Sequence, residues 1–235
     1  MAESAATLPV PVLPEPPFSR HRDVALVAGS VVAVFVGLSI PHFLKSGIGQ
    51  PIHISDFRLW RTLCTEIVLA AIWLPVLRRR GWALGHTTRA YEKRDLLRGL
   101  GLAFAAYVLY VLAYYAAAAV WPGFPARATF RLTGTVSWLT VLSLIVLNPV
   151  FEEVLYEGYV ANALRRSGWP IALGVSAAAR TVIHLYQGAI ALTSILPTGL
   201  LFTGYYLRTR RLWPLVVGHA LLDLIGLAFY AHGIA

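Results

Sequence analysis

The fold is decided by the stretch Val141-Leu-Ser-Leu-Ile-Val-Leu-Asn-Pro-Val-Phe-Glu-Glu-Val-Leu-Tyr-Glu-Gly158. It places two adjacent carboxylates, Glu152 and Glu153, in a segment that is apolar enough to lie in lipid. An ionisable side chain in that position costs about 2.5–3.5 kcal/mol on insertion scales, and those that occur usually serve a function. The stretch therefore predicts a polar site inside a membrane protein.

The composition of the whole chain also indicates a membrane protein. Of its 235 residues, 57% are hydrophobic and 13% are charged, whereas a soluble domain carries about 25% charged residues. The net charge of +9 is typical of basic residues that hold loops against anionic lipid, so it predicts membrane lipid as a partner and no nucleic acid. Because Cys64 is the single cysteine, the chain has no internal disulfide and no Cys-based metal site.

Apolar runs of about 20 residues recur along the chain, each long enough to cross a bilayer. We expect an all-α fold, a polytopic transmembrane bundle of about seven spans, because an open strand in lipid would leave its backbone unpaired. Residues 1–22 are predicted to form a disordered, proline-rich tail. Residues 23–132 should form the N-terminal helices, and residues 133–235 a core made of the last four spans. The expected spans are Val24–Leu44, Leu59–Leu77, Gly99–Val120, Val136–Leu164, Trp169–Gln187, Ala189–Leu207 and Leu212–Ala231.

Most of the Lys and Arg residues fall in alternate connections between these spans. Positive charges concentrate on the cytoplasmic side of a membrane protein. We therefore expect the cell membrane as the location, with the N-terminus in the cytoplasm and the C-terminus outside. Glu66, in the second span, is expected to form a structural pair with Arg61 or Arg58 near the outer face.

Six of the ionisable groups inside the spans form three pairs spaced four residues apart. Four residues make about one helical turn, so the members of a pair share a face. These faces should turn toward one another, because lipid does not solvate them. At a rise of about 1.5 Å per residue, His219 lies nearer the cytoplasm than the other groups, so the site closes only if the helices tilt. The pairs are Glu153 with Glu157, Arg180 with His184, and His219 with Asp223.

A carboxylate beside two imidazoles can bind a metal ion or position a water molecule. The same carboxylate can act as a general base on that water. Asp223, one turn after His219, can orient a ring or, if protonated, help to stabilise an oxyanion. The cluster is thus suited to hydrolysis.

The polar residues form three motifs, which are Glu152-Glu153-x-x-x-Glu157-Gly158, Arg180-x-x-x-His184-Leu-Tyr-Gln-Gly188 and His219-Ala-Leu-Leu-Asp223. They resemble the motifs of the CPBP family, the CAAX prenyl proteases and bacteriocin-processing intramembrane proteases. The resemblance covers about Val136 to Ala231, and it implies a protease core over residues 133–235. It also implies hydrolysis of a peptide bond within the membrane, with a peptide or a membrane protein as the substrate.

The resemblance also implies roles for these residues. Glu152 would be the general base that activates water, and His184 and His219 would hold that water directly or through a metal ion. Asp223 stands where the family often has an asparagine that stabilises the oxyanion, and Glu153 would be a supporting group. Zinc would accept two histidines, a carboxylate and water, but the sequence leaves open whether the reaction uses a metal.

Two positions depart from the family pattern. The family arginine after the Glu-Glu pair is Glu157 here, and the family phenylalanine before the first histidine is Arg180. Together they suggest that the positive charge has moved to another helix, which keeps a supporting ion pair in the site. The alternatives are a non-catalytic protein, such as a bacteriocin-immunity factor or a degenerate family member, and a proton-coupled transporter, since carboxylate–histidine clusters also relay protons.

Overall fold

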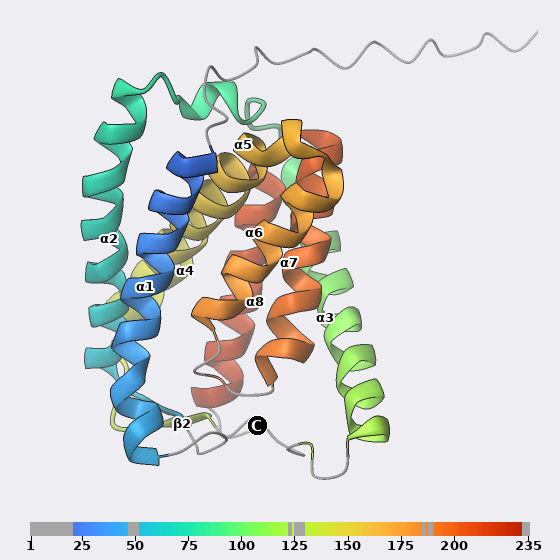
Figure 1. Cartoon of the computed structure of the whole chain (residues 1–235). Coiled ribbons are helices and arrows are strands. Elements are labelled where there is room, and N and C mark those ends of the chain that lie inside the picture. Colours follow the sequence, from blue (N-terminus) through green and yellow to red (C-terminus); the bar gives the residue numbers. More distant parts are fainter. Residues whose placement is uncertain are drawn as a thin grey trace, which may run out of the picture.

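The computed structural model describes residues 21–46, 52–121, 124, 130–184, 187 and 190–231. Residues 1–20, which hold most of the expected tail, lie outside the described residues. The helices pack side by side in one bundle (Figure 1). They are α1 (His21–Ser46), α2 (Asp56–Arg79), α3 (Arg94–Val120), α4 (Trp138–Glu153), α5 (Asn162–Leu164), α6 (Trp169–Ile183), α7 (Ile190–Thr209) and α8 (Trp213–Ala231). Two short 3₁₀ helices, η1 (Leu84–His86) and η3 (Arg165–Ser167), and the π-helix η2 (Val154–Ala161) complete the helical elements.

The expected all-α bundle is confirmed. Each predicted span coincides with a helix, and the fourth coincides with the unbroken run α4–η2–α5. Among the residues that the structure describes, four helical runs are long and apolar enough to cross a membrane, and α6 and α8 provide shorter apolar helices. The four runs are His21–Ile40, Asp56–Arg79, Arg94–Val120 and Trp138–Ser167.

Two short strands interrupt the helical pattern, and the sequence did not predict them. Strand β1 (Ile52–Ile54) pairs in parallel with β2 (Phe130–Leu132), and Ile52 lies opposite Phe130. Both strands lie in connections between helices, below the bundle in Figure 1. Backbone groups there are not surrounded by lipid, so the open edges of a two-stranded sheet carry no membrane penalty.

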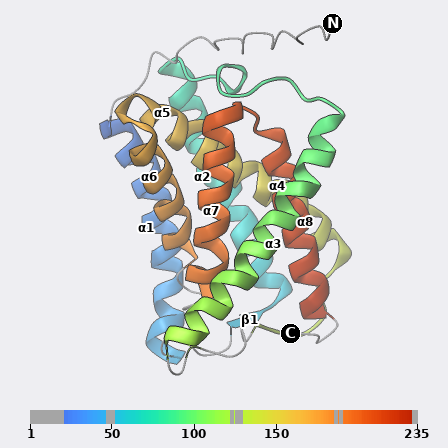
Figure 2. The same cartoon turned by 90° about the vertical axis from the view of Figure 1, so that its right-hand side faces the viewer.

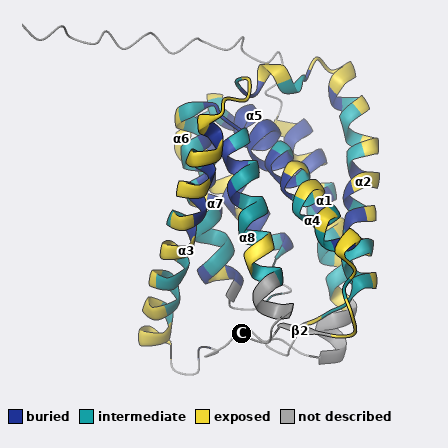
Figure 3. Ribbon diagram, turned by 180° about the vertical axis from the view of Figure 1, so that it is seen from behind, coloured by how far each residue is buried: buried dark blue, intermediate teal, exposed yellow. Residues whose placement is uncertain are grey.

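The distribution of side chains is that of a protein surrounded by lipid. Exposed residues lie on the outward faces of the helices and in the connections, and the buried ones line the interior (Figure 3). Large apolar side chains are among the most exposed, with Phe104 on α3 72% exposed and Trp138 on α4 79% exposed. Buried carboxylates and a buried arginine occupy the interior instead. Lipid imposes this pattern, in which apolar groups face outward and charged groups face inward.

One hydrogen-bonded connection holds the start of α2 against the start of α4. Ser137 caps α4 by accepting a hydrogen bond from the backbone N–H of Thr140 at 3.1 Å. Asp56, the first residue of α2, accepts a hydrogen bond from the backbone N–H of Ser137 at 2.9 Å. Side-chain acceptors at helix starts satisfy N–H groups that have no partner within the helix. This connection positions the helix that carries Glu66 next to the helix that carries Glu152.

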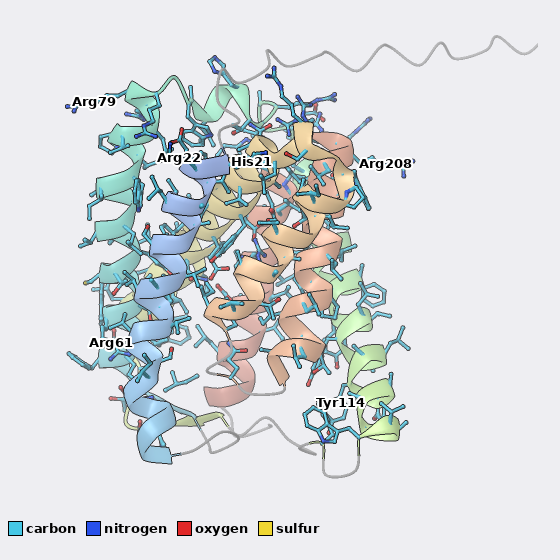
Figure 4. The ribbon with its side chains drawn as sticks, viewed as in Figure 1. His21, Arg22, Arg61, Arg79, Tyr114 and Arg208 are labelled. Carbon is cyan, nitrogen blue, oxygen red and sulfur yellow. The ribbon has the colours of Figure 1, made fainter. Side chains whose placement is uncertain are left out.

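The two ends of the bundle differ in charge. Arg22, Arg79 and Arg208 lie at one end, and Arg61 and Tyr114 lie toward the other (Figure 4). The segregation agrees with the alternation of basic residues that the sequence predicts. We refer to the end that holds Arg22, Arg79 and Arg208 as the basic end.

Helix α3 crosses α7 and α8 at close range (Figure 2). Gly99 on α3 makes the approach possible, because a Cβ atom there would lie 2.6 Å from Val217 Cγ1 and 2.9 Å from the carbonyl oxygen of Pro214. Gly218 on α8 faces the same crossing, and its Cβ would lie 3.0 Å from the carbonyl oxygen of Gly99. The two helices therefore approach closely at these two glycines.

We expect Gly99→Ala to destabilise the protein by about 1–3 kcal/mol, because the new methyl group overpacks the α3–α8 crossing. Thermal unfolding of the purified variant measures the loss. Gly101→Ala is the matched control, since a Cβ there meets nothing within 4 Å and alanine favours the helix. If both variants lose the same stability, the close crossing is not the cause.

Candidate active site

The candidate site begins where α4 changes its geometry. Helix α4 ends at Glu153, and the chain continues directly into a π-helix over Val154–Ala161. The sequence predicted a regular helix through this region. A π-helix bonds each N–H one residue further back, which widens the turn and changes which side chains share a face. Such segments are rare and occur frequently at functional sites.

Glu153 connects three helices. Its side chain is fully buried, and its Oε1 accepts a hydrogen bond from Arg180 Nη2 of α6 at 2.8 Å. The same oxygen lies 2.7 Å from His219 Nδ1 of α8. The structure thus brings the three predicted polar faces together in one buried cluster.

Arg180 lies between Glu153 and Glu157. Its Nη2 is 3.3 Å from Glu157 Oε1, and both residues are buried. Glu157 also accepts hydrogen bonds from Ser176 Oγ at 2.8 Å and Thr203 Oγ1 at 3.1 Å. The contact between Glu157 and Arg180 suggested by the two departures is present, and Glu153 shares the guanidinium. A buried charge is tolerated when it is paired and hydrogen-bonded in this way.

Glu152 and His184 face each other across a short gap. His184 Nε2 lies 3.7 Å from Glu152 Oε1, while His184 Nδ1 lies 2.8 Å from the carbonyl oxygen of Arg180. The carbonyl can only accept, so Nδ1 carries the proton in this contact. Glu152 is 4% exposed, and its Oε2 has no hydrogen-bond partner among the described residues. The two atoms are too far apart for a good direct hydrogen bond, and a water molecule beside the pair could contact both of them.

His219 lies between two carboxylates. Glu153 contacts its Nδ1, and Asp223 Oδ1 lies 3.6 Å from its Nε2. The other oxygen of Asp223 accepts a hydrogen bond from Asn148 Nδ2 at 3.1 Å. Asp223 is therefore placed to orient the ring of His219, and Asn148, which the sequence analysis missed, holds Asp223 in position.

Glu66 belongs to the same neighbourhood. It is 2% exposed, and its Oε2 has no hydrogen-bond partner among the described residues. The charges of Glu152, Asp223 and His219 act on it. One signal in the sequence pointed to this position, because Glu66 is an acid inside an apolar span and such acids usually face a polar interior.

The expected pairing of Glu66 with Arg61 or Arg58 is wrong, because the described part of the chain contains no such ion pair. Arg61 precedes Glu66 by five residues, which places it about 140° around an α-helix. Arg61 therefore does not share the inward-facing side of the helix with Glu66.

An apolar cavity of about 300 Å³ lies beside Glu66, between α1, α2 and the α4–η2 run. Its lining includes Val31, Trp73, Phe151 and Tyr159, with Glu66 as its acidic member. Phe151 directly precedes Glu152 in the chain, so the cavity adjoins the carboxylate that faces His184. The arrangement offers space for an apolar group next to the polar cluster.

The sequence leaves open whether a metal ion is bound, with His184 and His219 as the candidate ligands. Within the described ranges, no three His, Cys, Asp or Glu side chains are grouped so that they could hold a metal ion. His184 faces Glu152, and His219 faces Glu153 and Asp223. A catalytic zinc site needs three protein ligands around one point, so this donor arrangement does not fit zinc.

The fold and its buried charges define an integral membrane protein. Residues 133–225 match the family described as "Type II CAAX prenyl endopeptidase Rce1-like". This match supports the resemblance to the CPBP family of CAAX-type intramembrane proteases that the motifs predicted. The match spans every motif residue from Glu152 to Asp223. No curated protein and no solved structure matches the chain.

Proposed function

We propose that this protein is an intramembrane endopeptidase that hydrolyses a peptide bond with water activated by Glu152. The observation that carries the proposal is the buried gap of 3.7 Å between Glu152 Oε1 and His184 Nε2. Glu152 keeps a second oxygen without a partner among the described residues. A general base needs such an available oxygen within reach of the water.

In the proposed reaction, a water molecule beside the pair contacts both Glu152 Oε1 and His184 Nε2. Glu152 takes one proton from the water, and the hydroxide oxygen forms a bond to the carbonyl carbon of the substrate. His219, held between Glu153 and Asp223, supplies positive charge that stabilises the oxyanion. When the C–N bond breaks, Glu152 returns the proton to the leaving amine.

Glu153 and Arg180 support this reaction by position. Glu153 contacts both Arg180 and His219 through the same oxygen, so it fixes the ring that faces the oxyanion. Arg180 offsets the charges of Glu153 and Glu157. We propose that Asp223 orients His219 and does not donate to the oxyanion itself, because Asn148 and His219 already face its two oxygens.

The substrate that best fits the site is a peptide with a large apolar group, such as a prenylated peptide. The apolar cavity next to Glu66 has about 300 Å³ of space for such a group. Burial of apolar surface contributes about 25 cal/mol per Å², so the cavity would favour a prenylated peptide over its unmodified counterpart. We further propose that the basic end faces the cytoplasm of the cell membrane.

The test is cleavage of a fluorophore-labelled, farnesylated CAAX peptide by the full-length protein in liposomes. We expect cleavage of the farnesylated peptide and about tenfold slower cleavage of the unmodified peptide. Folding of the same preparation is checked by thermal unfolding. A folded protein that cleaves neither peptide would contradict the proposal. Proton flux across the same liposomes would then favour a transporter, and its absence a non-catalytic protein.

Chelation provides a separate prediction about the mechanism. Because the donor arrangement does not fit zinc, we expect cleavage to stay within about twofold after treatment with EDTA or 1,10-phenanthroline. Metal analysis of the treated and untreated protein accompanies the assay. Loss of activity that zinc restores would show that His184 and His219 act through a metal ion.

A further inference from the structure

Three arginines at the basic end form a group that we call the arginine cluster: Arg89, Arg165 and Arg210. Arg210 directly follows α7, Arg165 directly follows α5, and Arg89 lies between α2 and α3. The backbone N–H of Arg89 donates to the carbonyl oxygen of Arg210 at 3.2 Å. The charge of Arg165 acts on Arg210. Arg208, two residues before Arg210, marks this end in Figure 4.

The guanidinium of Arg210 is buried but not neutralised. Arg210 is 6% exposed, and its Nε and Nη1 have no hydrogen-bond partner among the described residues. The Nη2 donates to Asn162 Oδ1, and the guanidinium carbon lies 4.7 Å from the centre of the Tyr206 ring. Arg89 Nε is also buried without a partner within the described chain. These contacts fix the plane of the Arg210 side chain and leave its donors available.

The other buried arginines of the bundle are paired with acids. Arg180 contacts Glu153 and Glu157, and Arg211 contacts Glu92 and Asp95. Across the described residues, no carboxylate forms an ion pair with any member of the arginine cluster. A buried charge without a counter-charge is costly, so the cluster lacks a negative group that the fold supplies elsewhere.

The backbone of Arg210 adds a second unusual feature. Its φ is 58°, and in the part of the chain that the structure describes no other non-glycine residue has a positive φ. Such a conformation costs free energy and is often found at ligand sites. Burial also lowers the pKa of Arg210, as expected for a cation that has lost water without gaining an anion.

We propose that the arginine cluster binds an anion with the chemistry of a phosphate group, supplied either by a lipid headgroup or by free phosphate. Guanidinium groups match phosphate oxygens through paired N–H donors. Arg89 and Arg165 are partly exposed, so an anion can contact them from the surface and supply the acceptors that Arg210 lacks. Basic pockets at the cytoplasmic ends of transmembrane helices bind anionic headgroups in this manner.

The experiment uses the full-length protein, delipidated in a phosphate-free maltoside detergent. Thermal unfolding is followed by tryptophan fluorescence. One arm compares inorganic phosphate with sodium chloride at equal ionic strength. A second arm compares dioleoyl phosphatidic acid with dioleoylglycerol, which has the same chains and no phosphate. We expect a phosphate-bearing probe to raise Tm by about 5 °C, because a ligand that binds only the folded state stabilises it.

Substitutions show which arginines bind the phosphate-bearing probe. Arg210→Gln should abolish the rise in Tm, and Arg208→Gln, an exposed neighbour, should keep it. If Arg210→Gln does not fold, Arg165→Gln provides the test, and it should reduce the rise in Tm by at least about half. A rise in both arms identifies phosphate itself as sufficient, and a rise with phosphatidic acid alone identifies a lipid headgroup. No rise in either arm, or a full rise in Arg165→Gln and Arg210→Gln, would overturn the proposal.

Discussion

Replacement of Glu152 by glutamine is expected to reduce peptide cleavage by about 10²–10⁴-fold, the range typical of general acid–base catalysis. Glutamine has nearly the same shape as glutamate, but its amide cannot take a proton from water. The gap to His184 Nε2, 3.7 Å in the structure, stays similar in size. The effect should therefore appear in kcat and leave the KM for a farnesylated peptide close to that of the wild type.

Two measurements separate this prediction from a loss of fold. The Tm of Glu152→Gln should equal or exceed that of the wild type, because the variant removes a buried carboxylate with an unpartnered oxygen. Glu92→Gln, on the exposed connection between α2 and α3, is the control and should keep wild-type cleavage. Wild-type turnover by Glu152→Gln would assign the base to another residue, with Glu66, on which the charge of Glu152 acts, as the next candidate.

Replacement of Arg180 by methionine is expected to destabilise the protein by about 3–5 kcal/mol, the cost of breaking a buried ion pair from one side. The substitution leaves Glu153 and Glu157 facing each other without the guanidinium that contacts both. It also removes the contacts of the guanidinium with the rings of Tyr156 and Phe202. Thermal unfolding and the yield of folded protein measure the loss, and Arg208→Met is the exposed control.

The cause of that loss can be tested by restoring neutrality. The triple variant with Arg180→Met, Glu153→Gln and Glu157→Gln should regain most of the lost Tm and stay inactive, because Glu153 no longer holds His219. The charge-reversed pair, Glu157→Arg with Arg180→Glu, should be more stable than either single variant. If the reversed pair is worse than both singles, the two residues do not act as a pair.

The sequence predicted the helices well, because lipid enforces a simple rule. Runs such as Leu59–Leu77 are long and apolar, and in lipid their backbone N–H and C=O groups can find hydrogen-bond partners only within a helix. The same rule placed the pairs that include Glu153, Arg180 and His219 in the interior. The expected distance between His219 and the other groups is absent, since its Nδ1 lies 2.7 Å from Glu153. The positions of the helix ends in the sequence do not reveal how the helices tilt against one another to produce this contact.

Other parts of the site left weaker signals. Asn148 is a neutral side chain in an apolar run, and nothing in its spacing relates it to Asp223, 75 positions later in the chain. Glu66 was interpreted through the nearest arginines in sequence, whereas its neighbours come from α4 and α8. The π-helix over Val154–Ala161 is also not encoded by local residue preferences.

The π-helix also affects how this chain is compared with its relatives. A π-helical turn accommodates one more residue than an α-helical turn, so it behaves as an insertion within a continuous helix. A relative whose helix is regular between Glu153 and Asn162 superposes on this chain only when one position is skipped there. A gap-free pairing of the two sequences would match each later residue, up to the end of the helix, with the wrong neighbour in space.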